Sequence, residues 1–200
     1  MKRYVVALGL ALLLPCLAAV PEVDKAKAEG SPNAPVVMEV FASFDCPHCR
    51  EFDEVTLPLV KRDFVNSGKV YLVHREFPLS GPYHPYAREA ATYAVAAGRI
   101  GKYGQVAEAL FQNQATWAVN GNVWGTVSAV LSPAEQKRVQ VLAKEPGVVA
   151  EVEHDYQEGI ALGVNATPTV CVTHGSQRFP IQAQNLNYTF LKSLVDTMAK

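Results

Sequence analysis

Two cysteines separated by two residues follow almost directly after an apolar stretch, and this feature constrains the fold more than any other. The stretch Pro35–Ser43 reads PVVMEVFAS, and Cys46 and Cys49 follow within CPHC. Its β-branched and aromatic residues predict a strand buried on both faces, as in a parallel or mixed central sheet. Beyond the cysteines, apolar residues recur at roughly helical spacing as far as Val60. The pair is therefore predicted where a buried strand turns into a helix.

The remaining pattern predicts an α/β fold interrupted by helices. A second strand is predicted at Lys69–Leu79, and the order strand, helix, strand implies a right-handed crossover between parallel strands. Strand signals then vanish from Tyr83 to about Leu162, where the sequence is alanine-rich and helical in pattern. The sheet resumes with ATPTVCV and with QRFPIQ, whose Pro180 indicates an edge strand. An amphipathic helix is predicted at the end of the chain.

The first 19 residues have the layout of a secretory signal peptide. Lys2 and Arg3 precede an unbroken apolar run that Pro15 ends, and small residues follow. The run is too short for an ordinary membrane span, so we predict export with cleavage of residues 1–19, with an uncleaved anchor as the alternative. Residues 20–34 are polar and contain proline and glycine, which predicts a flexible lead-in.

Composition and cysteine count narrow the class of protein. The chain has 200 residues, 49% of them hydrophobic, so it can bury a hydrophobic core and does not need disulfides to hold its fold together. No run of basic residues points to a nucleic-acid partner. After cleavage an exported chain would keep Cys46, Cys49 and Cys171, an odd number, so at least one thiol is unpaired or reactive. Cys171 lies in an apolar strand and is predicted to be a buried, inert thiol.

The CPHC pair admits three interpretations from its residues alone. It is a structural staple, a metal site or a redox pair. Zinc takes four ligands, and Cys46, Cys49 and His48 offer too few without a partner motif, so no metal is predicted. At a helix N-terminus, free backbone N–H groups and the helix dipole favour a thiolate on Cys46. A protonated His48 adds a positive neighbour, and Pro47 suits the first helical turn.

These features together resemble the DsbA-like secreted thiol–disulfide oxidoreductases of the thioredoxin superfamily. The resemblance rests on CPHC, on the helical insertion and on TPT before the third strand, and it runs from Pro35 to the end of the chain. It implies a thioredoxin-like fold with a helical domain inserted between the second strand and the Thr-Pro strand. Residues 35–82 and 163–200 would form the thioredoxin-like domain, and residues 83–162 the insertion.

The resemblance also implies site residues. Thr167 and Pro168 would face Cys46, would be joined by a cis peptide bond and would bind substrate, with the Thr167 backbone free to pair with an extended peptide. A departure from the family lies six residues before Cys46, where thioredoxin-like proteins carry a buried acid and this chain has Val40. Glu39 should point to the opposite face of its strand.

For Glu39 the expected partner is Lys69, Arg75 or a water molecule.

The four histidines outside CPHC are scattered without ligand spacing, and no role is assigned to them. They are His74, His84, His154 and His174.

The function implied is an exported dithiol oxidase that introduces disulfides into translocated proteins through the Cys46–Cys49 pair. It needs no cofactor beyond that disulfide. Its partners would be unfolded or partly folded exported proteins and a membrane quinone-linked reoxidase of the DsbB or VKOR type. The alternatives are a disulfide reductase or isomerase, a non-redox peptide-binding chaperone, and handling of copper or zinc by the same thiols.

Overall fold

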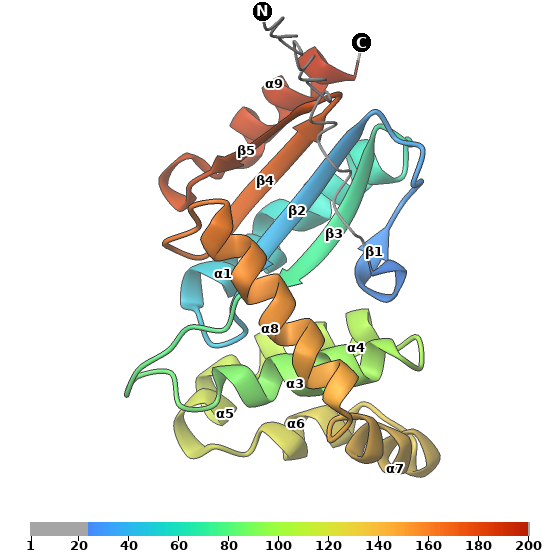
Figure 1. The fold of residues 1–200 in the computed structure, drawn as a ribbon, viewed down its shortest axis with the longest axis vertical. Helices are drawn as coiled ribbons and strands as arrows, with labels where there is room; N and C mark the ends of the chain where they lie inside the picture. Colours follow the sequence, from blue (N-terminus) through green and yellow to red (C-terminus); the bar gives the residue numbers. More distant parts are fainter. Residues whose placement is uncertain (1–23, 200) are drawn as a thin grey trace, which may run out of the picture.

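The computed structural model describes residues 24–199, and its centre is a mixed five-stranded sheet (Figure 1). The strand order is β1-β3-β2-β4-β5. The strands are β1 (Ala28–Glu29), β2 (Val36–Ala42), β3 (Val70–Glu76), β4 (Thr169–His174) and β5 (Gln177–Ile181). β2 is parallel to β3 and antiparallel to β4. The predicted α/β fold is confirmed, as is the edge position of the strand that contains Pro180.

One nearly continuous helical stretch follows β2. Its parts are α1 (Pro47–Glu51), η2 (Phe52–Thr56), α2 (Leu57–Val60) and η3 (Lys61–Val65). The segments η2 and η3 are π-helical turns, and Pro58 lies between them. Because proline cannot donate a backbone hydrogen bond, the regular α-helical ladder is interrupted there. The stretch therefore keeps its direction while its hydrogen bonding changes.

Helices fill the chain between β3 and β4, in the range where the sequence predicted a helical insertion. They are α3 (Ala87–Gly98), α4 (Tyr103–Gln112), α5 (Gln114–Asn120), α6 (Val123–Ala129), α7 (Pro133–Leu142) and α8 (Pro146–Ala161). Figure 1 shows α3 to α7 grouped beyond one end of the sheet, with the long α8 leading back from them to the strands. The short turn η4 (Ala183–Asn185) and the helix α9 (Tyr188–Met198) follow β5.

The two faces of the sheet pack against different layers. Met38 and Val40 of β2 belong to a core shared with α2 and with Leu191 of α9. Phe41 of β2 points to the other face, where it meets Phe77 in a cluster bordered by α8. Both faces of β2 are thus covered, which explains its nearly continuous apolar sequence. A third cluster fills the helical segment and extends to both cysteines of CPHC.

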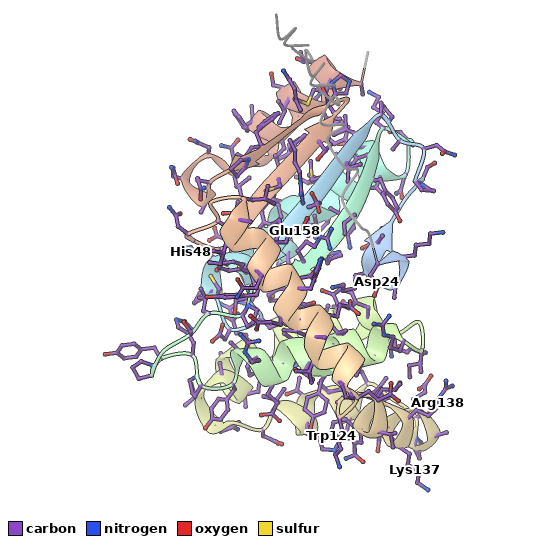
Figure 2. All side chains as sticks on the ribbon, in the orientation of Figure 1. Asp24, His48, Trp124, Lys137, Arg138 and Glu158 are labelled. Carbon is purple, nitrogen blue, oxygen red and sulfur yellow. The ribbon has the colours of Figure 1, made fainter. Side chains whose placement is uncertain are left out.

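Glu39 is fully buried and forms the centre of an ionic cluster on the α8 side of the sheet. Its carboxylate accepts hydrogen bonds from Arg75 at 2.9 Å and from Arg178 at 2.9 Å. Arg75 also donates to Asp155 of α8 at 2.9 Å, and Arg178 donates to Glu158 at 2.7 Å. Figure 2 labels Glu158 on the part of α8 that crosses the sheet. The cluster therefore ties β2, β3 and β5 to the last helix before β4.

The expectations for Glu39 are confirmed in part. Strand alternation placed it on the face opposite Val40, and the structure agrees. Of its expected partners, Arg75 is observed, whereas Lys69 lies 3.4 Å from Asp196 instead.

Residues 20–34 were expected to form a flexible lead-in, and for residues 24–34, which the structure describes, this expectation is wrong. From residue 24 onward the chain forms the 3-10 turn η1 (Lys25–Lys27) and the strand β1, which pairs with β3. Lys27 is 2% exposed and forms ion pairs with Asp155 and with Glu151. A buried ammonium group must be paired, so the ion pairs of Lys27 hold this segment against α8.

Residues 1–23, which include the predicted signal peptide, lie outside the described residues. None of the helices formed by residues 24–199 has the length and apolar character needed to span a membrane.

Candidate active site

The two cysteines of CPHC lie where β2 gives way to α1, as predicted. Cys46 is the N-cap of α1 and Pro47 is its first residue. Cys46 is 5% exposed and Cys49, one turn further, is 1% exposed. Both are free thiols in this structure. The sulfur nearer the surface is therefore the one at the helix N-terminus, where unpaired backbone N–H groups stabilise negative charge.

The turn before β4 faces Cys46. The peptide bond between Thr167 and Pro168 is cis, which confirms that expectation. The Cys46 thiol lies 3.4 Å from the Thr167 carbonyl oxygen, within range of a hydrogen bond to sulfur. The Thr167 hydroxyl is buried and has no hydrogen-bond partner among the described residues. Two segments that are 121 positions apart in the sequence thus meet at one sulfur atom.

The acidities of the two thiols are driven in opposite directions. The pKa of Cys46 is lowered to about 5, and the largest cause is a hydrogen bond from Cys49. The Thr167 side chain and the backbone N–H groups of Cys49 and His48 lower it further, whereas burial raises it. Burial raises the pKa of Cys49 well above its ordinary value, and the neighbouring Cys46 raises it further. Near neutral pH the pair therefore consists of one thiolate and one thiol.

His48 projects from α1 into solvent. Its side chain is 80% exposed, and its Nδ1 lies 3.9 Å from a carboxylate oxygen of Glu51. Figure 2 shows it at the outer edge of the molecule. An exposed ion pair of this length contributes little to stability. The part that His48 plays in tuning the cysteines stays a prediction.

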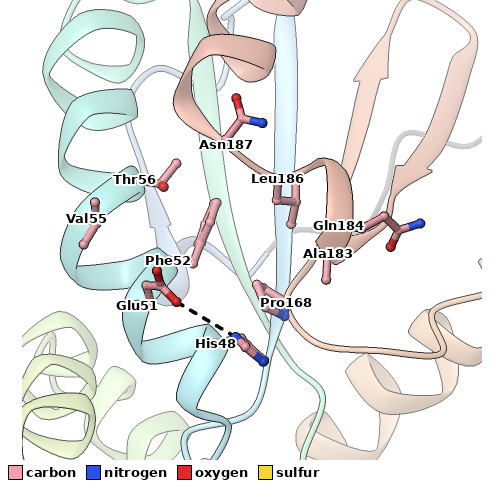
Figure 3. Close-up of a pocket in the computed structure, with 10 residues that line it drawn as sticks. All are labelled: His48, Glu51, Phe52, Val55, Thr56, Pro168, Ala183, Gln184, Leu186 and Asn187. Carbon is pink, nitrogen blue, oxygen red and sulfur yellow. Dashed lines mark ion pairs between the residues drawn. The ribbon is translucent and has the colours of Figure 1, made fainter.

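A groove of about 400 Å³ begins at His48 of CPHC and at Pro168 (Figure 3). His48 and Pro168 stand at one end, and the walls come from the start of the α1 stretch and from the segment around η4. Phe52, Val55 and Leu186 supply apolar surface, and Val55 is 61% exposed. The polar side chains that line it are Glu51, Thr56, Gln184 and Asn187. The groove is open and mixed in character, which suits an extended peptide better than a compact small molecule.

Some residues at the site were missed by the sequence reasoning. Gln114 of α5 is buried and donates to the carbonyl groups of Phe44 and Cys46, at 2.6 and 3.0 Å. His84, to which no role was assigned, hydrogen-bonds the buried Asp45 at 2.7 Å. The sequence signal that could have pointed to Asp45 was its position directly before Cys46.

Two further expectations concern thiols and metals. Cys171 is fully buried in β4, which confirms the predicted burial. Burial also raises its pKa to about 12, as expected for an inert thiol. Among residues 24–199, the metal-ligating side chains that cluster are His154, Asp155 and Glu158, away from the cysteines. Asp155 there is already engaged by Lys27 and Arg75.

Comparison with known proteins places the chain in a family. A thioredoxin family model matches residues 23–196, so the chain belongs to the thioredoxin family. Its fold is that of DsbA proteins. The crystal structure of Wolbachia pipientis α-DsbA1 superposes with a TM-score of 0.67 at 20% identity and covers 86% of this chain and 90% of that one.

Two sequence relatives are longer or only locally similar. The Na(+)/H(+) antiporter NhaA 1 of Mycolicibacterium vanbaalenii is 30% identical over 184 residues, which are 89% of this chain and 27% of that protein. The probable disulfide bond formation protein D of Bacillus cereus is 40% identical over 52 residues, 26% of this chain and 24% of that protein. The chain thus spans about a quarter of the length of the antiporter, and its match to the Bacillus protein is confined to about a quarter of each chain.

Proposed function

We propose that the chain is an exported thiol–disulfide oxidoreductase that works as a dithiol oxidase through Cys46 and Cys49. The observation that carries the proposal is the opposed acidity of the two thiols, with the pKa of Cys46 lowered to about 5 and that of Cys49 raised. A stabilised thiolate stabilises the reduced pair, so the disulfide form is the better oxidant. The DsbA fold and the similarity to a probable disulfide bond formation protein support it.

The reaction follows from this arrangement. In the oxidised protein a substrate thiolate attacks the sulfur of Cys46, a mixed disulfide forms, and the bond to Cys49 breaks. The electron pair of that bond goes to Cys49, which takes up a proton because its pKa is raised. A second substrate thiolate attacks the substrate sulfur of the mixed disulfide, and Cys46 leaves as a stable thiolate. The substrate loses two electrons and gains its own disulfide.

The remaining site residues have supporting roles in this proposal. Pro47 and His48 tune the pair from the first turn of α1. Thr167 and Pro168 bind the substrate backbone opposite Cys46, and the groove beside them accepts the flanking segment. The substrates are unfolded or partly folded exported proteins, and a membrane quinone-linked partner of the DsbB or VKOR type reoxidises the pair. Export rests on the sequence of residues 1–19.

The test is oxidation of a reduced peptide that carries two cysteines. The mature chain is first oxidised, then mixed with one equivalent of peptide, and the peptide disulfide is followed by mass. We expect stoichiometric transfer, and the Cys46→Ser variant should transfer nothing. The redox potential, measured against glutathione, should lie above that of a reductase such as thioredoxin, which is about −270 mV. A potential at or below that value would favour the reductase alternative.

The chaperone alternative makes the opposite prediction. If the cysteines are only a staple, Cys46→Ser would still prevent aggregation of an unfolded protein and the wild type would not oxidise the peptide. Location is tested separately, by fractionating cells that express the full chain. The mature protein should appear outside the cytoplasm, shortened at its N-terminus.

A further inference from the structure

The loop that carries Cys46 is fastened from the helical side by two side chains that the proposed reaction does not use. Gln114 of α5 holds the carbonyl groups of Phe44 and Cys46. His84 holds Asp45, with 2.7 Å between Nδ1 and the carboxylate. His84 belongs to the segment between β3 and α3, so its bond to Asp45 spans 39 positions.

Asp45 is a buried carboxylate one position before Cys46, whose sulfur the substrate attacks in the proposed reaction. It is 8% exposed, and its other oxygen accepts a hydrogen bond from the Ser43 hydroxyl at 2.5 Å. Ser43 in turn accepts from the backbone N–H of Leu79 at 3.1 Å. Because a carboxylate only accepts, the proton between His84 and Asp45 is on Nδ1 of the histidine. A buried carboxylate is tolerated only when it is paired, and His84 supplies that partner.

We propose that His84 is a positioning residue for Cys46 that acts through Asp45. It keeps the loop in the conformation in which Cys46 caps α1 and faces Thr167, and it does so by donating a hydrogen bond to the carboxylate of the residue directly before Cys46. The inference rests on the proposed function only because that function requires a Cys46 thiolate. The contacts themselves do not depend on it.

Removal of His84 should disfavour the Cys46 thiolate for two reasons. The Asp45 carboxylate loses a hydrogen-bond donor, so its negative charge is less well stabilised one position before Cys46, and a nearby negative charge disfavours a second one. The carboxylate is also drawn toward solvent, and residue 45 pulls the sulfur of Cys46 away from the N–H groups of α1. Both effects act through Asp45, so they should vanish when residue 45 has no side chain that can accept from His84.

The experiment is a double-mutant cycle read by thiolate absorbance. The reduced variants His84→Ala, Asp45→Ala and the double variant are titrated near 240 nm, with the signal assigned to Cys46 by its loss in Cys46→Ser. We expect His84→Ala to raise the midpoint by about one pH unit, a tenfold fall in the acid dissociation constant of Cys46, and to lower the redox potential by about 30 mV. In the Asp45→Ala background, the same substitution should produce no shift.

Two further variants separate positioning from general stability. His84→Asn places an amide N–H close to the position of Nδ1, so it should return the midpoint of Cys46 most of the way to the wild-type value. Tyr83→Ser is the matched control, because Tyr83 is the neighbouring residue and is 89% exposed. It should leave the midpoint unchanged. Should His84→Ala not fold, His84→Gln takes its place, because its longer amide cannot reproduce the same geometry.

Two results would overturn the inference. One is an unchanged Cys46 midpoint in a folded His84→Ala variant, and the other is an equal shift with and without the Asp45 carboxylate. The titration involves no substrate, so its outcome is independent of peptide oxidation. A wild type that fails to oxidise peptide would refute the proposed function and leave the cycle interpretable. A cycle without coupling would refute the role of His84 and leave the oxidase proposal standing.

Discussion

The carbonyl oxygen of Thr167 lies 3.4 Å from the sulfur of Cys46, and the hydroxyl of the same residue is buried without a hydrogen-bond partner among residues 24–199. After the Cys49 thiol, the Thr167 side chain is the next contributor to the lowered pKa of Cys46. In this structure the hydroxyl has no partner among the described residues, and we expect it to donate to the sulfur once Cys46 is ionised. The contact therefore favours the ionised, reduced pair.

We predict that Thr167→Val raises the pKa of Cys46 and makes the disulfide less oxidising. A hydrogen bond to a charged group contributes about 1.5 to 3 kcal/mol, and one pKa unit corresponds to about 1.4 kcal/mol, so a rise of about one unit or more is expected. Thiolate absorbance against pH measures it. Thr173→Val is the matched control, because that hydroxyl is also buried without a hydrogen-bond partner and lies in β4 away from the pair. An equal shift in both variants would contradict the assignment.

The opposed acidity of the pair predicts how its redox potential depends on pH. Each proton taken up with the two electrons contributes about 30 mV per pH unit. Below pH 5 reduction takes up two protons and the slope should approach about 59 mV per unit, twice the one-proton value. Above pH 5 Cys46 stays ionised, only Cys49 takes up a proton, and the slope should fall to about 30 mV. A two-proton slope that continues to pH 8 would show that Cys46 is an ordinary thiol.

The redox motif and the order of strands could be predicted because their signals are local. CPHC follows a strand whose apolar run is unbroken except for Glu39, and the helix begins at once. The direction of Glu39 followed from strand alternation alone. Its partner Arg178 did not, because 139 positions separate the two and no periodic pattern relates them.

Long-range polar pairs explain the remaining failures of sequence reasoning. Lys27 lies in a polar stretch that is typical of a loop, yet it is buried against Asp155, 128 positions away. His84 stands between glycine and proline residues, and its partner Asp45 carries no signal except its place before Cys46. The burial of a charged residue depends on a counter-charge that only the tertiary fold supplies.

Glu76 gives a prediction for stability against pH. It is buried at the end of β3 and accepts a hydrogen bond from the Tyr103 hydroxyl at 2.7 Å. Burial raises its pKa from 4.5 to about 8, although Lys27 and Tyr103 oppose the rise. Between these two values the folded state holds a proton that the unfolded state has lost, so stability falls as pH increases. Above pH 8 this contribution is constant.

Substitution at this site should change that pH dependence. Glu76→Gln should flatten the decline between pH 5 and pH 8, and Tyr103→Phe should extend it to higher pH because the opposing hydrogen bond is lost. The free energy of unfolding in urea is measured on the oxidised protein, in which neither Cys46 nor Cys49 titrates. If Glu76→Gln keeps the slope of the wild type, the group responsible lies elsewhere.

The close approach of α8 to the sheet depends on Gly159. A Cβ at this position would lie 2.6 Å from a ring carbon of Phe77 and 3.0 Å from one of Phe41, well inside van der Waals contact. These two rings meet edge to face, with centroids 6.4 Å apart, so neither can move without disturbing the other. Phe77 directly follows β3, and Phe41 is in β2. The fit at Gly159 thus determines how α8 packs against the strand that leads to Cys46.

We predict that Gly159→Ala destabilises the protein by about 1 to 3 kcal/mol, the usual cost of overpacking a core. Gly147→Ala in the same helix is the matched control, because a Cβ there has no neighbour within 4 Å. Alanine favours a helix over glycine, so this variant should gain up to about 1 kcal/mol. Urea denaturation at one pH measures both free energies of unfolding. Opposite signs are expected, and a Gly159→Ala variant as stable as Gly147→Ala would mean that α8 does not pack this closely on the two rings.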